Sequence, residues 1–117
     1  MTGWRERFHP LSDGRFLARD GPAKDRIHRG HKACLFGADA ELLGSILDDL
    51  ATEPGIAFVK ISTRPRDGVV LGRVFADQVD GVLEVWTRFK AHPRLHCCVQ
   101  DDALVGPWRA RVVLHAR

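Results

Sequence analysis

The sequence predicts a single α+β domain with an antiparallel sheet, and three observations support that fold class. The chain has 117 residues, a length that suits one domain. Hydrophobic residues make up 44% of it and charged residues 28%, a composition typical of a chain with a buried core. Segments with helical apolar spacing alternate with short runs rich in β-branched and aromatic residues. We therefore expect helices packed on a sheet.

Residues 1–30 are expected to form a basic hairpin and loop segment ahead of an α+β core at 31–117. Apolar runs on either side of residues 12–14 indicate a short hairpin with a glycine turn, and residues 20–22 indicate a loop. Residues 1–32 hold eight Lys or Arg against four acids, a net charge of +4, whereas residues 33–117 hold ten against eleven. The excess positive charge therefore lies in the N-terminal segment.

The core begins with a predicted strand at 31–36 and a helix after it. Asp39 is a good N-cap because its carboxylate can accept a hydrogen bond from a backbone N–H of the first turn. Pro54 and Gly55 stop the helix. Asp48 lies late in the helix, where the helix dipole disfavours a carboxylate, so we expect an arginine or lysine beside it. The apolar side of this helix consists of Leu42, Leu43, Ile46, Leu47 and Leu50.

Strands at 56–63 and 69–75 are expected to form a hairpin around a turn at 64–68. Residues 77–92 fit a helix or a strand, and a helix is favoured because an apolar stripe repeats at helical spacing. Asp77 would cap this helix, and Pro93 would end it at His92. Strands at 95–99 and 108–114 follow. A strand at 77–92 would instead give a mostly β meander around one helix.

The order β-α-β-β-α-β-β from residue 31 onward begins with the six elements of a ferredoxin-like split β-α-β core. In that topology two helices cover one face of the sheet and leave the other face open. The strand at 95–99 then lies beside the strand at 31–36. We expect the N-terminal hairpin and the last strand to extend the sheet or to cover part of its open face.

Strand alternation assigns residues to the two faces of the sheet. The helix-covered side receives mainly apolar residues, namely Ala57, Val59, Ile61, Leu95, Cys97, Val99, Ala110, Val112 and Leu114. The opposite side mixes aromatic rings with cations, and the residues assigned to it are Phe58, Lys60, Arg73, Phe75, His96, Cys98, Arg109, Arg111 and His115.

These features predict a small non-catalytic binding or regulatory protein. It would act through the open sheet face and the basic N-terminal segment, and its partner would be a protein, including a second copy of itself. The face residues expected to bind are Phe58, Lys60, Arg73, Phe75, His96, Arg109 and Arg111. The basic segment could hold a phosphate or a carboxylate, through Arg26, His28, Arg29, His31 and Lys32.

Two other functions fit the sequence. A dimeric α+β-barrel enzyme or ligand-binding protein would have a pocket lined by Phe58, Phe75, Trp86, His96 and Arg111. Single-stranded RNA could bind the face instead, because exposed rings stack bases and cations neutralise phosphates. The strand at 69–75 lacks the aromatic-rich signature of an RNA-recognition sheet.

The cysteines are Cys34, Cys97 and Cys98, and an odd number with an adjacent pair is a poor disulfide framework. We expect reduced thiols in a cytoplasmic protein without a signal peptide or spanning helix. Pairing of strands 31–36 and 95–99 would bring Cys34 near Cys97 or Cys98. Zinc-ligand spacing is absent, so no metal or other cofactor is expected. Cys98 beside His96 could be an activated nucleophile, but the sequence identifies no acid to orient the imidazole, and no catalytic residue is assigned.

Overall fold

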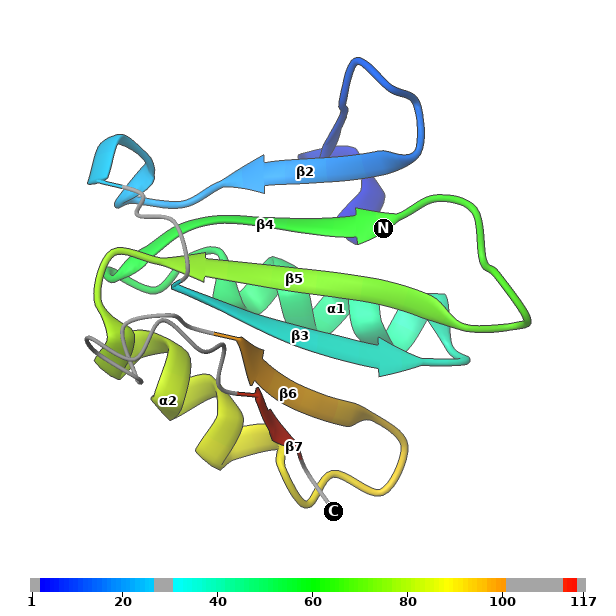
Figure 1. The fold of residues 1–117 in the computed structure, drawn as a ribbon. Helices are drawn as coiled ribbons and strands as arrows, with labels where there is room; N and C mark the ends of the chain where they lie inside the picture. The colour runs from blue at the N-terminus through cyan, green and yellow to red at the C-terminus, as the bar shows by residue number, and fades with distance from the viewer. Residues whose placement is uncertain (1–2, 27–30, 101–112, 116–117) are drawn as a thin grey trace.

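A computed structural model describes residues 3–26, 31–100 and 113–115, and this part of the chain forms one antiparallel sheet with two α-helices (Figure 1). The α+β class is confirmed. Two short 3-10 helices, η1 (Trp4–Arg7) and η2 (Lys24–Arg26), accompany them. The α-helices and strands in chain order are β1 (His9–Pro10), β2 (Phe16–Asp20), β3 (Lys32–Gly37), α1 (Ala40–Leu50), β4 (Ile56–Ser62), β5 (Val70–Ala76), α2 (Val79–Phe89), β6 (His96–Gln100) and β7 (Val113–His115).

The strands lie in the order β1-β2-β4-β5-β3-β6-β7, and each neighbouring pair is antiparallel. The strand expected at 95–99 does lie beside the strand expected at 31–36, with Cys34 opposite Cys98. The N-terminal hairpin extends the sheet beyond β4, and β7 extends it beyond β6. Most of the last predicted strand, at 108–114, lies outside the described residues.

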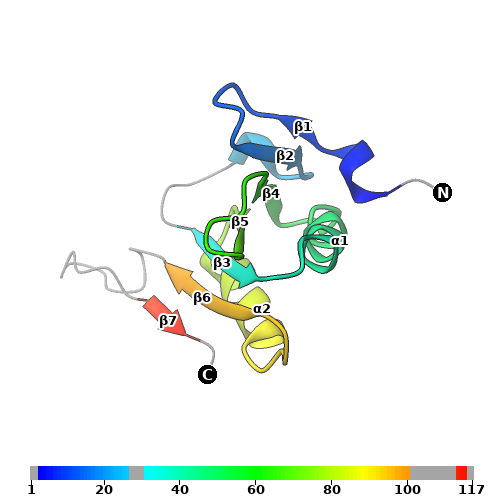
Figure 2. The same cartoon turned by 90° about the vertical axis from the view of Figure 1, so that its right-hand side faces the viewer.

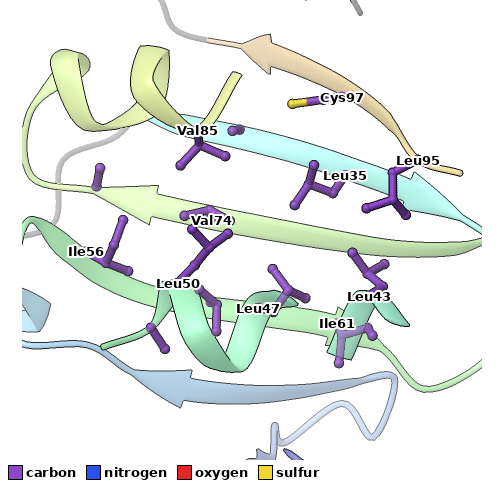
Figure 3. Packing of buried hydrophobic residues seen from close by; sticks show 14 of the residues in the cluster. Leu35, Leu43, Leu47, Leu50, Ile56, Ile61, Val74, Val85, Leu95 and Cys97 are labelled. Carbon is purple, nitrogen blue, oxygen red and sulfur yellow. The ribbon is translucent and has the colours of Figure 1, made fainter. Parts of the chain in front are cut away.

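The two helices pack on the same face of the sheet and enclose one hydrophobic core. Leu43 and Leu47 of α1, Val85 of α2, and Leu35 and Val74 of the sheet belong to a single buried cluster. Figure 3 shows these side chains meeting between the sheet and the helices, with Cys97 beside them. The alternation predicted for β4 and β6 is confirmed for Val59, Ile61, Leu95, Cys97 and Val99, which belong to the buried cluster. Ala57 is buried but lies outside that cluster, at a β-bulge, and the neighbouring Ile56 faces the core instead.

The helix starts agree with the sequence in one case and differ in the other. Asp39 caps α1 as expected, since its Oδ1 accepts a hydrogen bond from Leu42 N at 3.0 Å. The prediction that Asp77 caps α2 is wrong, because Gln78 is the N-cap residue and its side chain makes no cap bond. The backbone N–H of Asp77 donates to Gly55 O, which keeps this residue beside the start of β4. The helix also ends at Phe89, before the expected His92, because a turn follows.

The start of the N-terminal segment, η1, packs on α1, on the helix side of the sheet. Trp4 is 6% exposed and its ring meets Phe8 edge-on at 5.2 Å between centroids. Figure 2 shows η1 next to α1, on the helix side of the sheet. None of the helices in the described ranges is long and apolar enough to cross a membrane.

Candidate functional site

We use "open face" for the sheet surface opposite α1 and α2. None of the described helices lies over it, as the end-on view in Figure 2 shows for the central strands. Register and alternation place three cations and several half-buried rings on it. Its members with described side chains are His9, Phe16, Ala18, Asp20, Lys32, Cys34, Phe36, Phe58, Lys60, Ser62, Leu71, Arg73, Phe75, His96 and Cys98. Asp20 is the carboxylate among them, and it is paired with Lys24 at 3.7 Å.

Two cations lie side by side at the centre of the open face. Lys60 on β4 is directly opposite Arg73 on β5. The same cross-strand row continues with Ala18 on one side and Cys34 on the other, so it holds no carboxylate among these positions. Like charges directly opposite each other destabilise a sheet. Within the described residues, none of the ion pairs involves Lys60, Arg73 or Lys32.

Lys60 and Arg73 both make cation–π contacts with aromatic rings of the open face. Lys60 Nζ lies 4.7 Å from the centroid of the Phe16 ring and 5.8 Å from that of Phe75. The Arg73 guanidinium carbon lies 5.8 Å from the Phe16 centroid. Partial burial lowers the pKa of Lys60, and the positive charges of Arg73 and Lys32 lower it further. The Nε of Arg73 is buried and has no hydrogen-bond acceptor in the described part of the chain.

A hollow of about 470 Å³ opens at the end of the open face where the β1–β2 and β4–β5 connections meet. Four arginines line it and no acidic residue does, which makes it an anion-attracting surface. Arg15 has one weak ion pair, with Asp13 at 3.7 Å. The full lining is Arg15, Phe16, Ser62, Arg64, Arg66, Val69, Leu71 and Arg73.

A tight hairpin turn positions two of these arginines. Asp67 and Gly68 both have positive φ, 56° and 76°, as the two central residues of a type I′ turn do. Arg66 and Val69 form the closing bridge, with hydrogen bonds in both directions of 3.0 and 3.1 Å. The turn therefore fixes the backbone of Arg66, which lines the hollow. Arg66 lies within the turn predicted at 64–68.

The apolar part of the open face is a stacked pair of phenylalanines. The Phe58 and Phe75 rings lie 4.3 Å apart between centroids and 12° from parallel. A β-bulge between Ile56 and Phe58 sets this register. Lys32 is opposite Phe75 on β3 and Asp20 is opposite Phe58 on β2, so the cross-strand row of the rings has a cation at one end and a carboxylate at the other. Along the strands, Lys60 and Arg73 are the next residues on this face after Phe58 and Phe75. A ligand on this face would meet apolar and cationic groups together.

The predicted binding residues are only partly brought together. Phe58, Lys60, Arg73 and Phe75 are contiguous, and Lys32 of the basic segment joins them. His96 lies on the same face but on β6, near Phe36 with 5.9 Å between ring centroids. His31 immediately precedes β3, and Arg26 ends η2. Arg109, Arg111, His28 and Arg29 lie outside the described residues.

Part of the basic segment has a structural role. Asp48 is 7% exposed and accepts hydrogen bonds from Arg7 Nε at 2.9 and 3.0 Å and from Arg7 Nη2 at 2.6 Å. Arg19 also donates to this carboxylate and, at 3.1 Å, to the Asp48 carbonyl. The hydrogen bonds from Arg7 and the charges of both arginines hold the pKa of Asp48 below its ordinary value. The sequence predicted one cation beside Asp48, and the structure has two, Arg7 and Arg19.

The lining predicted for an enzyme or ligand-binding pocket is divided between the two faces of the sheet, and its member Arg111 lies outside the described residues. Trp86 belongs to α2 and packs against the core on the helix side, whereas Phe58 and Phe75 face the other way. Trp4 is buried, and its ring packs against Gly44 of α1. No group of three potential metal ligands occurs in the described part of the chain.

The sequence reasoning missed Arg15, Arg64 and Arg66 as site residues. Arg64 and Arg66 appeared only as members of a turn, and Arg15 as a member of a hairpin. Their signal was indirect. Arg15 lies in the connection before β2, and Arg64 and Arg66 lie in the connection after β4, so the three come together only because β2 pairs with β4. Comparison of the chain with models of protein families, with curated proteins and with solved structures finds no match.

Proposed function

We propose that the core has a ferredoxin-like fold. Its support is the strand order β4-β5-β3-β6, in which β5 lies between β3 and β4 although α1 connects those two strands. The second helix joins β5 to β6 in the same way. This topology leaves the open face to a partner.

We propose further that the protein is a non-catalytic binding protein whose open face takes an acidic, partly apolar segment of another protein. The observation that carries this proposal is the Lys60–Arg73 pair, two opposed cations without a carboxylate partner in the described residues. A carboxylate from outside would relieve the repulsion between them and could accept a charge-assisted hydrogen bond. The arginine hollow extends this surface toward Arg64 and Arg66.

Ring geometry favours a peptide over single-stranded nucleic acid. Base stacking needs an accessible aromatic face. Phe58 and Phe75 stack on each other, and Lys60 and Arg73 lie over Phe16. Charge also favours a different protein over a second copy, because two copies meeting face to face would bring these cations together.

The experiment is a titration of the full chain with a fluorescent peptide rich in glutamate and leucine, at several salt concentrations. We expect saturable binding that weakens with salt, and about tenfold weaker binding for Arg73→Met, the value of one charge-assisted hydrogen bond. Lys90→Met is the charge-matched control, since Lys90 lies over Trp86 on the helix layer. The Lys90→Met variant should bind the peptide with the same affinity as the wild-type chain.

Three results would contradict the proposal. They are the absence of saturable peptide binding at low salt, an equal loss for Arg73→Met and Lys90→Met, and tighter binding of single-stranded oligouridine than of the peptide. The last result would instead support the nucleic-acid alternative, with phosphates as the anions held by the open face.

A further inference from the structure

Two of the three cysteines are arranged as a pair across neighbouring strands. Cys34 on β3 is directly opposite Cys98 on β6, and both belong to the open face. Residues opposite each other in an antiparallel pair have Cα atoms about 4.5–5.5 Å apart. A disulfide requires a Cα separation of about 4.4–6.8 Å. The backbone therefore already meets the first geometric requirement of a cross-strand disulfide.

Cys97 differs from this pair although it adjoins Cys98 in sequence. Its side chain points into the core between the sheet and the helices, as Figure 3 shows, and it is fully buried. Cys34 and Cys98 retain 7% and 8% of their surface. Burial raises the pKa of Cys97 to about 12. An oxidant as small as a peroxide can thus reach the pair more readily than Cys97.

The surroundings of the pair favour one thiolate and one thiol. Hydrogen bonding with Cys98, together with the charges of Arg73 and Lys32, lowers the pKa of Cys34 to about 6 against the opposing effect of burial. The same hydrogen bond and burial raise the pKa of Cys98. Arg73 is directly opposite Cys34 on β5, on the other side of β3 from Cys98. Thiolates are the reactive form of cysteine, so Cys34 is the nucleophile of the pair.

We propose that Cys34 and Cys98 form a reversible disulfide between β3 and β6, with a hydroperoxide as the oxidant. The Cys34 thiolate attacks one peroxide oxygen, the O–O bond breaks, and the departing oxygen takes a proton to leave as water or an alcohol. The sulfur of Cys98, losing its proton, then attacks the sulfenic acid and releases water. Two thiols lose two electrons in total, and the peroxide gains them. A dithiol reductant reverses the change.

The test uses the full chain treated with a stoichiometric amount of hydrogen peroxide, followed by free-thiol counting and mass spectrometry. We expect loss of two free thiols and a cross-link that dithiothreitol removes. Because Cys97 and Cys98 are adjacent, variants must identify the partner. Cys97→Ala should form the cross-link at the wild-type rate, whereas Cys98→Ser should not form it and should accumulate the sulfenic acid of Cys34.

A second measurement, on the wild-type chain, needs no variant to fold. The rate of alkylation by iodoacetamide, followed by peptide mapping, should show Cys34 reacting with a midpoint near pH 6 and Cys97 remaining unmodified in the folded chain. The proposal is overturned if Cys97→Ala abolishes the cross-link, if Cys34 goes to sulfinic acid in the wild-type chain without cross-linking, or if Cys34 alkylates with an ordinary thiol midpoint.

Discussion

Lys60 and Arg73 are directly opposite each other on β4 and β5, on the side of the sheet that the helices leave uncovered. A pairing of like charges at this position weakens the sheet by a few tenths of a kcal/mol to about 1 kcal/mol. The fold tolerates it because Phe16 lies beneath both cations and solvent still reaches them. Under the proposed function, an anionic partner would offset the repulsion between the two cations.

Removing one of the two opposed cations should separate stability from binding. We expect Lys60→Met to keep the apolar contact with Phe16 and to unfold with a free energy equal to that of the wild type or up to about 1 kcal/mol higher. Binding of the acidic peptide should weaken in the same variant. Urea denaturation and the peptide titration measure the two effects. A loss of more than about 1 kcal/mol would mean that Lys60 chiefly stabilises the fold.

The Asp48 carboxylate should account for part of the acid sensitivity of the fold. Its folded pKa is below the ordinary value, so its stabilisation is present above about pH 4 and is lost as the pH falls through the folded pKa. Asp48→Asn should lower the free energy of unfolding by about 2 kcal/mol at pH 7, because Arg7 and Arg19 lose their charged side-chain acceptor. Near pH 2 the variant and the wild type should differ less. A gap that is equal at both pH values would contradict this reading.

We expect that the packing of the Trp4 ring on α1 requires a glycine at position 44. A Cβ at this position would overlap the indole, so Gly44→Ala should destabilise the fold by about 1–3 kcal/mol despite the higher helix propensity of alanine. In a Trp4→Ala background the same change should stabilise α1 by about 1 kcal/mol. Chemical denaturation of the four proteins forms a double-mutant cycle. Additive effects would show that the ring and the helix do not interact.

Oxidation should change peptide affinity through charge, if the proposed function holds. The Cys34 thiolate adds a negative charge next to Arg73, and a disulfide removes it. We therefore expect the cross-linked protein to bind the acidic peptide more tightly than the reduced protein at pH 7, with a smaller difference at pH 5, where the reduced thiol is protonated. Titrations of both forms measure this effect. Weaker binding after cross-linking would contradict the proposed charge coupling while leaving the disulfide itself established.

The fold was largely predictable because its signals are local. Hydrophobic spacing located α1, and alternation placed Val59 and Ile61 inward and Phe58 and Lys60 outward. Asp77 was misassigned because a carboxylate before a helix resembles a cap in sequence, whereas a backbone bond to Gly55 determines where Asp77 lies.

The site was less predictable because it depends on contacts between distant segments. Trp4 is buried through Gly44, forty residues along the chain. The arginine hollow forms because the N-terminal hairpin pairs with β4. Composition predicted an excess of positive charge in the N-terminal segment, but it did not show that Arg7 and Arg19 of that segment bind Asp48.

The central claim is that the open face binds an acidic protein segment, and an NMR titration tests it most directly. Isotope-labelled protein would be titrated with the glutamate-rich peptide while backbone amide shifts are followed. We expect the largest shifts at Lys32, Lys60, Arg73 and Phe75, with α1 and α2 nearly unchanged. Shifts concentrated on the helices, or no shifts at saturating peptide, would contradict the account.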